Sequence, residues 1–306
     1  PSLEGKVFFC VQTNELKMDA DILVKINEAI EKYVEHNPGS MTDMFQTRLV
    51  PTGAMSRYEL MSMVFNMGNE SSFDKLIRGR RWEGRESEVM TMLHNLDSRD
   101  AKFINDTWKM VDSLWTPIAE LEKRLSGVEP ERVSPRSFTF TTSDGIAMNM
   151  EGGYFPLKYD QRFSDAGRKQ EVGPLNEGGY IPATTPRGHT KKRTGYAGPI
   201  LFDFGQVLQR HLRGVIKDVT HREFINDARS LLKDSRIKDV IRERIGWGYV
   251  GAMQKWLDGI VNDGSAVSTD GLNALDGWAE GKRGKLSTVV LGYKVASILS
   301  QFAGLP

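Results

Sequence analysis

The sequence predicts a mainly α-helical fold, a helical bundle-like domain that carries one small β-hairpin and a long irregular arm rich in glycine and proline. Three observations support this prediction. Apolar residues recur at helical spacing along most of the chain. Two Ser/Thr-x-x-Glu sequences are typical of helix N-terminal capping boxes. Between residues 152 and 198, the density of glycine and proline excludes long regular elements.

In the first third of the chain, the apolar spacing predicts a series of amphipathic helices. One begins at Asp19 and ends before Asn37-Pro38-Gly39. A capping box formed by Ser56 and Glu59 predicts a second helix, which ends near Gly68. Further helices are expected over residues 89–96 and after a cap at Asp97 or Ser98, and Pro117 should kink or restart the last one.

The middle of the chain changes character. Residues 137–141 alternate between apolar and polar, residues 143–145 have turn chemistry, and residues 146–150 can return as a partner strand, so a β-hairpin is expected. In the arm that follows, two similar segments place a glycine pair before an aromatic residue and a proline. We interpret them as turns with anchoring side chains, and a ligand-binding loop is the alternative. The motif residues are Gly152, Gly153, Tyr154 and Pro156 in the first segment, and Gly179 and Tyr180 in the second.

Helical spacing resumes at Phe204, and Thr220 with Glu223 forms the second capping-box sequence, which predicts that a new helix begins there. Residues 237–245 and 249–261 predict two more helices. The last stretch, residues 286–305, is apolar and contains Lys294 as its single charge. It is expected to be a buried helix, because small polar residues dilute it, and contact with a membrane or a partner is the weaker alternative. The expected regions are therefore residues 1–135, 136–200 and 201–306, with the two helical regions sharing one core.

Composition and motifs provide no candidate for catalysis. Lys and Arg number 41 against 40 for Asp and Glu, so the overall charge gives no reason to expect nucleic acid or an anionic membrane as a partner. The single cysteine, Cys10, lies in an apolar run and cannot form an internal disulfide. No phosphate loop, dinucleotide fingerprint or nucleophile elbow occurs, and no two histidines have the helical spacing of metal ligands. We therefore expect no catalytic residue, no metal and no cofactor.

One local charge cluster stands out against this balanced background. Arg187, Lys191, Lys192 and Arg193 place four positive charges within seven residues beside Gly188. Such a cluster could bind phosphates of DNA or RNA through ion pairs that weaken with salt. The alternative is that these side chains pair with acidic helix faces of the same protein.

Several stretches, taken together and in this order, resemble a module of very large bacteriophage polypeptides, the internal virion, ejected or large polyvalent proteins. The resemblance runs from Arg57 to the end of the chain. Its main stretches are residues 65–69 with Lys75 and Leu76, residues 108–117, 152–160, 188–193, 211–218 with His221, and 290–304.

The resemblance implies a context but no catalytic residues. It implies a non-enzymatic structural or interaction module, a fragment of a larger virion protein that is packaged in the phage particle and could be ejected into the host cell. The expected partners are other virion proteins or other parts of the same polypeptide. Binding of DNA through the basic cluster is the alternative function, and membrane contact by the C-terminal segment is a weaker possibility.

Overall fold

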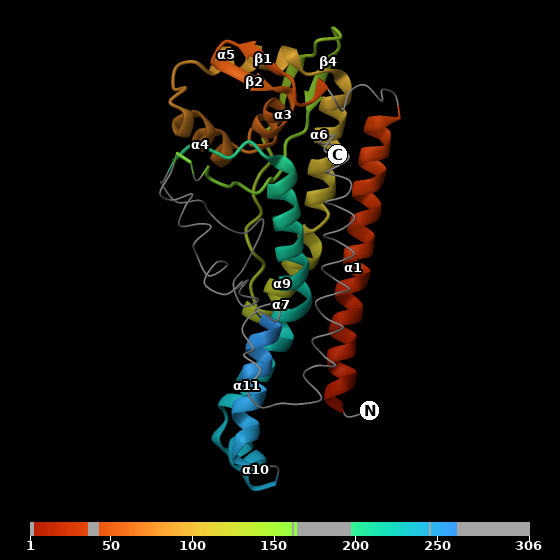
Figure 1. Ribbon diagram of the computed structural model, residues 1–306, viewed down its shortest axis with the longest axis vertical. Coiled ribbons are helices and arrows are strands. Elements are labelled where there is room, and N and C mark those ends of the chain that lie inside the picture. The colour runs from red at the N-terminus through yellow and green to blue at the C-terminus, as the bar shows by residue number, and fades with distance from the viewer. Residues whose placement is uncertain (1–2, 36–42, 161, 164–196, 245, 262–306) are drawn as a thin grey trace. The chain divides into compact units, whose positions relative to one another are not determined.

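The computed structural model describes residues 3–35, 43–160, 162–163, 197–244 and 246–261, and it confirms the mainly helical fold (Figure 1). The described chain forms two compact units. Unit 1 contains the first helix up to Asp19 and the residues from Arg213 onward. Unit 2 contains Ala20 to Phe163 and residues 197–212. Each unit therefore combines segments that are far apart in the sequence.

Unit 2 holds most of the elements. Its first helix, α1 (Leu3–Val34), begins in unit 1 and is followed by a hairpin and a series of shorter helices. These are β1 (Thr47–Val50), β2 (Gly53–Ser56), α3 (Arg57–Phe65), α4 (Glu70–Arg80), α5 (Glu86–Met92), η1 (Leu93–Asn95), α6 (Ser98–Asp112), α7 (Trp115–Ser126), β3 (Phe138–Thr141) and β4 (Ala147–Met150).

Side-chain caps fix where the helices of unit 2 begin. Ser56 caps α3 and Glu59 returns the bond to the Ser56 amide, which confirms the predicted capping box. Asp97 caps α6 in the same reciprocal way with Asp100, so the cap falls on Asp97 and not on Ser98. Asn69 caps α4, a helix that the sequence analysis did not predict. The helical run is interrupted between α6 and α7. Pro117 lies in the first turn of α7, where its missing amide proton costs little.

Both sheets are two-stranded antiparallel hairpins. The expected hairpin pairs Phe138 with Met150 and Thr141 with Ala147. The other pairs Thr47 with Ser56 across a turn and was not predicted. Its strands have only four residues each, too short for apolar alternation to stand out from the sequence.

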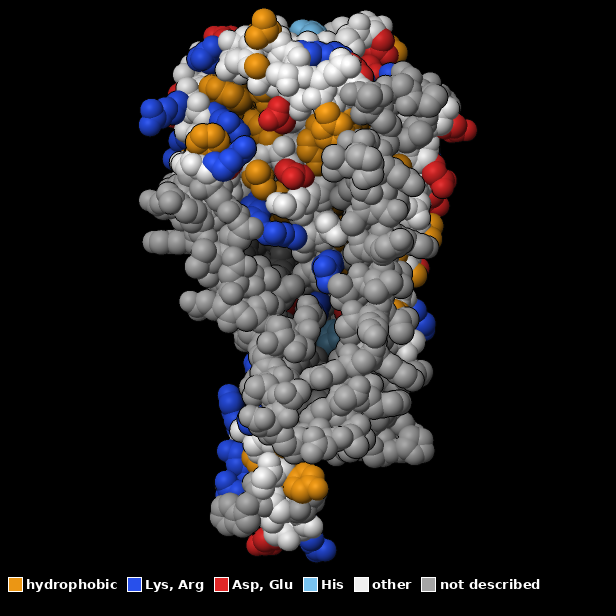
Figure 2. All heavy atoms as spheres, viewed as in Figure 1, with side chains coloured by type: hydrophobic (Ala, Val, Ile, Leu, Met, Phe, Trp, Pro, Cys, Tyr) orange, Lys and Arg blue, Asp and Glu red, His pale blue; other side chains and the backbone are white. Residues whose placement is uncertain are grey.

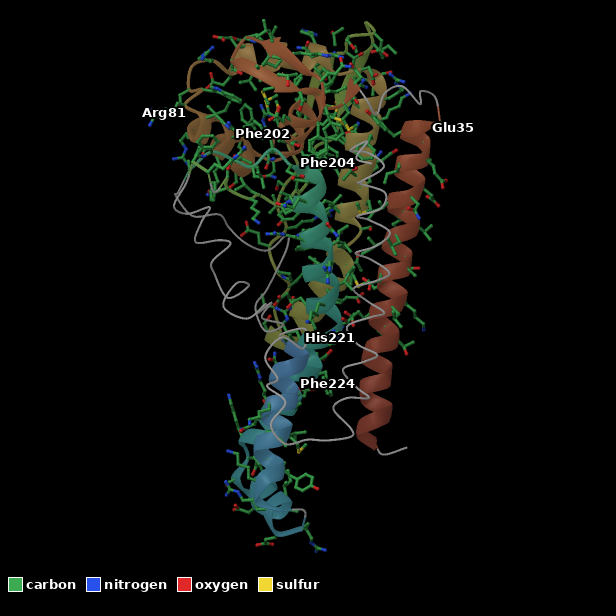
Figure 3. All side chains as sticks on the ribbon, viewed as in Figure 1. Glu35, Arg81, Phe202, Phe204, His221 and Phe224 are labelled. Carbon is green, nitrogen blue, oxygen red and sulfur yellow. The ribbon has the colours of Figure 1, made fainter. Side chains whose placement is uncertain are left out.

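The core of unit 2 is rich in methionine and aromatic residues. Its largest fully buried side chains include Trp108, Phe65, Phe155 and Met44. Helices α3 and α6 contribute much of this core, together with residues of β4 and the start of α9 (Phe204–Lys233). Phe202 and Phe204 lie where the chain enters α9 (Figure 3).

Unit 1 consists of the N-terminal part of α1, the later part of α9, α10 (Ser235–Arg244) and α11 (Trp247–Val261). Among the described residues of unit 1, one apolar cluster buries Ile225, Leu232 and Leu257, with Phe224 packed beside them (Figure 3). Helix α10 has no buried residue, while Val240 and Tyr249 are more than half exposed. On the face drawn in Figure 2, Lys and Arg side chains gather around the end formed by α10 and α11.

Two predicted helix boundaries were wrong. Helix α1 begins at Leu3, well before Asp19, because the apolar run around Cys10 continues the helix. Thr220 does not start a helix either. It lies inside α9, where its hydroxyl donates to the carbonyl oxygen of Ile216 at 2.8 Å. A Ser/Thr-x-x-Glu sequence can occur within a helix, because the hydroxyl can bond to the preceding turn instead of capping.

Candidate functional site

The structure describes only part of the predicted site. Arg187, Lys191, Lys192 and Arg193 lie outside the described residues, as do Gly179, Tyr180 and the apolar segment 286–305. The first glycine-aromatic segment, from Gly152 to Pro156, is described, and it meets two other stretches that carry the phage resemblance. We call this meeting point the glycine-aromatic junction and define it by Phe65, Gly68, Trp108, Gly153 and Phe155.

In the junction, the backbone at Gly68 lies close to the Trp108 indole ring and to the backbone of Gly153, because Gly68 has no Cβ atom. A Cβ atom added to Gly68 would lie 2.6 Å from the Trp108 ring and 2.8 Å from the Gly153 carbonyl oxygen. The Gly68 carbonyl accepts hydrogen bonds from the amides of Gly153 at 2.7 Å and Arg136 at 2.8 Å. The turn after α3 is thereby joined to the segment that precedes β3 and to the segment that follows β4.

Aromatic stacking completes the junction. The ring of Phe155 stacks on Phe65 with centroids 4.5 Å apart, and Phe65 meets the edge of Trp108 at 6.1 Å. Phe155 is 1% exposed and Tyr154 is 9% exposed, as expected for anchoring side chains. Tyr154 lies on the ring of His211 at 5.4 Å, which connects the segment to α9.

The described ends of the arm pair with each other. The amide of Asp160 donates to Pro199 O at 2.8 Å and that of Leu201 donates to Lys158 O at 2.8 Å, on either side of a bridge between Tyr159 and Ile200. The chain therefore leaves this pairing at Asp160 and returns to it at Pro199. Gly79 of α4 lies against the returning segment, since a Cβ at this position would be 2.1 Å from Gly198 O.

A second arrangement, a buried ionic network, lies around Arg57 at the start of α3. The Arg57 Nε donates to Asp100 Oδ2 at 2.8 Å, and Nη2 donates to Asp97 Oδ2 at 2.6 Å and to Asp100 Oδ1 at 2.9 Å. Tyr33 of α1 donates its hydroxyl to Asp100 Oδ1 at 2.8 Å. Asp43 accepts from Arg57 Nη1 at 3.3 Å. The network thus joins α1, the segment before β1, α3 and α6.

Charges in this ionic network balance, which explains how it tolerates burial. Arg48 and Arg99 pair with Asp43 and Asp97, so that three arginines face three aspartates. Burial opposes ionisation of Asp97, but its bonds from Arg99, the Asp100 amide and Arg57 hold the pKa of this carboxyl below its usual value. The hydrogen bond from Arg48 lowers the pKa of Asp43 in the same way. Complete burial raises the pKa of Asp100, against the opposing pull of Arg57.

Sequence reasoning identified only part of the ionic network. It singled out Ser56 and Asp97 as caps, because capping boxes are local patterns. It did not predict that Arg57, next to one cap, would bind both carboxylates of the other. No sequence signal joins Arg57 to residues 40 and 43 positions away, since that contact depends on how α3 packs against α6.

The junction and the ionic network each hold segments together that lie far apart in the sequence. Within the described residues, no three His, Cys, Asp or Glu side chains are placed to bind a metal ion together. None of the described helices combines the length and the apolar composition that crossing a bilayer requires.

Comparison with protein-family models, with curated protein sequences and with solved structures gave no match for this chain.

Proposed function

We propose that the chain is a non-enzymatic structural or interaction module of a large phage virion-associated protein, packaged in the particle and delivered toward the host with the DNA. Its partners in this proposal are other virion proteins or other parts of the same polypeptide. The proposal starts from the sequence resemblance to internal virion and large polyvalent proteins.

One structural observation supports a structural role for the shared motifs. Three stretches that carry the resemblance, residues 65–69, the segment from Trp108 and residues 152–160, meet in the glycine-aromatic junction. Their side chains fill the core and their glycines allow backbones to approach. Residues used in this way fix the shape of the fold, and a component of an assembly needs a fixed shape to contact its partners.

Quantitative mass spectrometry of purified particles tests the proposal. Peptides from this chain should be present at a fixed copy number in full particles, and particles that have released their DNA should contain fewer of them. If extensively purified particles lack these peptides while infected cells contain them, the virion assignment is wrong. Retention of every copy after DNA release would contradict delivery but keep the structural role.

The basic cluster favours a second function, binding of nucleic acid. Arg187, Lys191, Lys192 and Arg193 supply the charge, and the described chain enters and leaves this segment at the paired positions Asp160 and Pro199. Four cations in one short segment can neutralise several phosphates, although the whole chain carries a formal charge of only +1.

Salt-dependent binding measurements separate this function from a purely structural one. Affinity for duplex or single-stranded DNA should fall linearly with salt on a log-log scale, and Lys191→Ala with Lys192→Ala should reduce the slope by about one unit per lost contact. The matched control removes two exposed lysines elsewhere, Lys102 and Lys123, and should leave the slope unchanged. Equal slopes for both double variants, or no binding at low salt, would contradict the idea. A lower melting temperature without any binding would instead support pairing with acidic helix faces.

A further inference from the structure

In unit 1, α1 and α9 face each other through charged side chains, which we call the charged seam: Glu15 and Asp19 on α1, with Arg213, Lys217 and His221 on α9. The two helices run antiparallel here. Glu15 contacts His221, with Oε2 and Nε2 3.5 Å apart, whereas Asp19, one turn further along α1, is attracted by Arg213, two turns earlier on α9. Both rows follow a four-residue spacing, so the seam repeats once per helical turn.

These groups are withdrawn from water. Asp19, Lys217 and His221 are 6%, 5% and 4% exposed. On α9, Asp218 and Arg222 are buried as well and lie 3.7 Å apart. Glu15, Asp19 and Asp218 equal Arg213, Lys217 and Arg222 in number, so the fixed charges of the seam and of this neighbouring pair balance when every carboxyl is ionised.

For Asp19, the cost of burying a charged carboxylate exceeds the attraction of the nearby cation. Burial raises its pKa to about 6, against the attraction of Arg213. No cation lies within ion-pair distance of Asp19 in the described part of the chain, whereas Glu15 and Asp218 each have a close basic neighbour. The ionised form of Asp19 therefore weakens the docking of α1, and protonation removes that cost.

His221 lies between the Thr220 hydroxyl and Glu15, and hydrogen bonding indicates how its ring is oriented. The Thr220 hydroxyl donates its proton to Ile216 O at 2.8 Å, so its oxygen is left to accept from His221 Nδ1, which lies 2.8 Å away. With the proton on Nδ1, the Nε2 atom that faces Glu15 carries a proton only in the imidazolium form. In that form, the contact with Glu15 is an ion pair.

We propose that the charged seam is a latch, tightened by mild acid and loosened as the pH rises toward neutrality, which controls whether the N-terminal part of α1 stays docked on α9. The sign follows from Asp19. A carboxyl that titrates higher in the docked state than in the released state stabilises docking at low pH, and this stabilisation is lost as the pH rises from about 4 to about 6. The latch is independent of the function proposed above.

Hydrogen exchange of the full chain, expressed as protection factors for residues 3–19 at pH 5 and pH 7.5, tests the latch. We expect protection to fall about tenfold over this interval from the titration of Asp19 alone, since its pKa is about 6 in the docked state and near 4 when released. Asp19→Asn should be more protected than the wild type at pH 7.5 and should respond less to pH.

Asp21→Asn is the matched control, because Asp21 is exposed on the same helix. It should keep the wild-type response. Wild-type protection that is equal at the two pH values would overturn the latch, as would lower protection of Asp19→Asn than of the wild type at pH 7.5. The second outcome would mean that Asp19 stabilises the contact as an ordinary ion pair. An equal flattening in Asp21→Asn would assign the response to helix charge in general and would also overturn the proposal.

Discussion

The ionic network of unit 2 and the charged seam of unit 1 both bury charges, but they satisfy them differently. In the ionic network, Arg57 uses all three of its nitrogens and each carboxylate has a cation within 3.3 Å. In the seam, Asp19 is buried with only a more distant Arg213, and Glu15 meets a histidine at 3.5 Å. Fully paired charges fix a structure, whereas partly paired ones leave an equilibrium that protons can shift.

The strongest test of this comparison removes the centre of the ionic network. Arg57→Ala leaves Asp97 and Asp100 buried without their main cation, and the free energy of unfolding should fall by about 3–5 kcal/mol. Urea denaturation of the variant measures the loss. The control is Arg78→Ala, which breaks an exposed pair with Asp74 and should cost at most about 1 kcal/mol. If the two variants lose similar stability, the ion pairs of the buried network contribute no more to stability than exposed ion pairs do.

Packing in the glycine-aromatic junction should be the next most sensitive feature. Gly68→Ala places a methyl group against the Trp108 ring and the Gly153 carbonyl, so we expect a loss of about 1–3 kcal/mol or more. The matched control, Gly251→Ala in α11, meets nothing within 4 Å and should stabilise its helix by up to about 1 kcal/mol. Thermal unfolding followed by circular dichroism distinguishes them. A neutral Gly68→Ala would mean that the two segments can move apart freely.

A smaller effect is expected where α1 joins the ionic network. Tyr33→Phe removes one donor from the buried Asp100, which keeps its bonds from Arg57 and the Asp97 amide, so the loss should be about 1–2 kcal/mol. The same chemical change at the half-exposed Tyr249 should be nearly neutral. Chemical denaturation of the two variants measures the difference. Equal stabilities would show that the Tyr33 hydroxyl contributes nothing to holding α1.

Asp43 and Asp97 of the ionic network should respond to pH with the opposite sign to Asp19 of the seam, while Asp100, whose pKa burial raises, offsets part of their response. The pKa values of Asp43 and Asp97 are lowered, so the stability they provide is present above pH 4 and is lost as the pH falls further. The seam, in contrast, should gain protection as the pH falls from 7.5 to 5. Hydrogen exchange between pH 3 and pH 7.5 follows α6 and the start of α1 in one experiment. Parallel responses of the two regions would remove the distinction on which the comparison rests.

Local patterns predicted the elements that depend on neighbours in the sequence. The capping box at Ser56, a helix cap at Asp97 or Ser98, the hairpin from Phe138 to Met150 and the helix α11 all follow from spacing within a few residues. The pattern at Thr220 failed because a hydroxyl inside a helix satisfies the same sequence by bonding to the turn before it.

Contacts between residues far apart in the sequence could not be predicted, for a different reason. The contact of Gly68 with Gly153 and the bond of Arg57 to Asp100 depend on which helices pack together, and composition does not encode this. The resemblance singled out the stretches that meet in the junction, but it did not predict that they contact one another. The basic cluster 187–193 stays a prediction.

The pairing of Tyr159 with Ile200 also bears on how the gene can change over evolution. Because the chain leaves and re-enters this pairing at neighbouring positions, the two ends of the intervening segment are held side by side by the hydrogen bonds between residues 158–160 and residues 199–201. The entropic cost of closing a loop grows only slowly with its length, so insertions and deletions there should be tolerated more readily than a single added methyl group at Gly79 or Gly68. Diverged homologues should therefore differ most in the length between these two positions, while they keep Gly68 and Gly79.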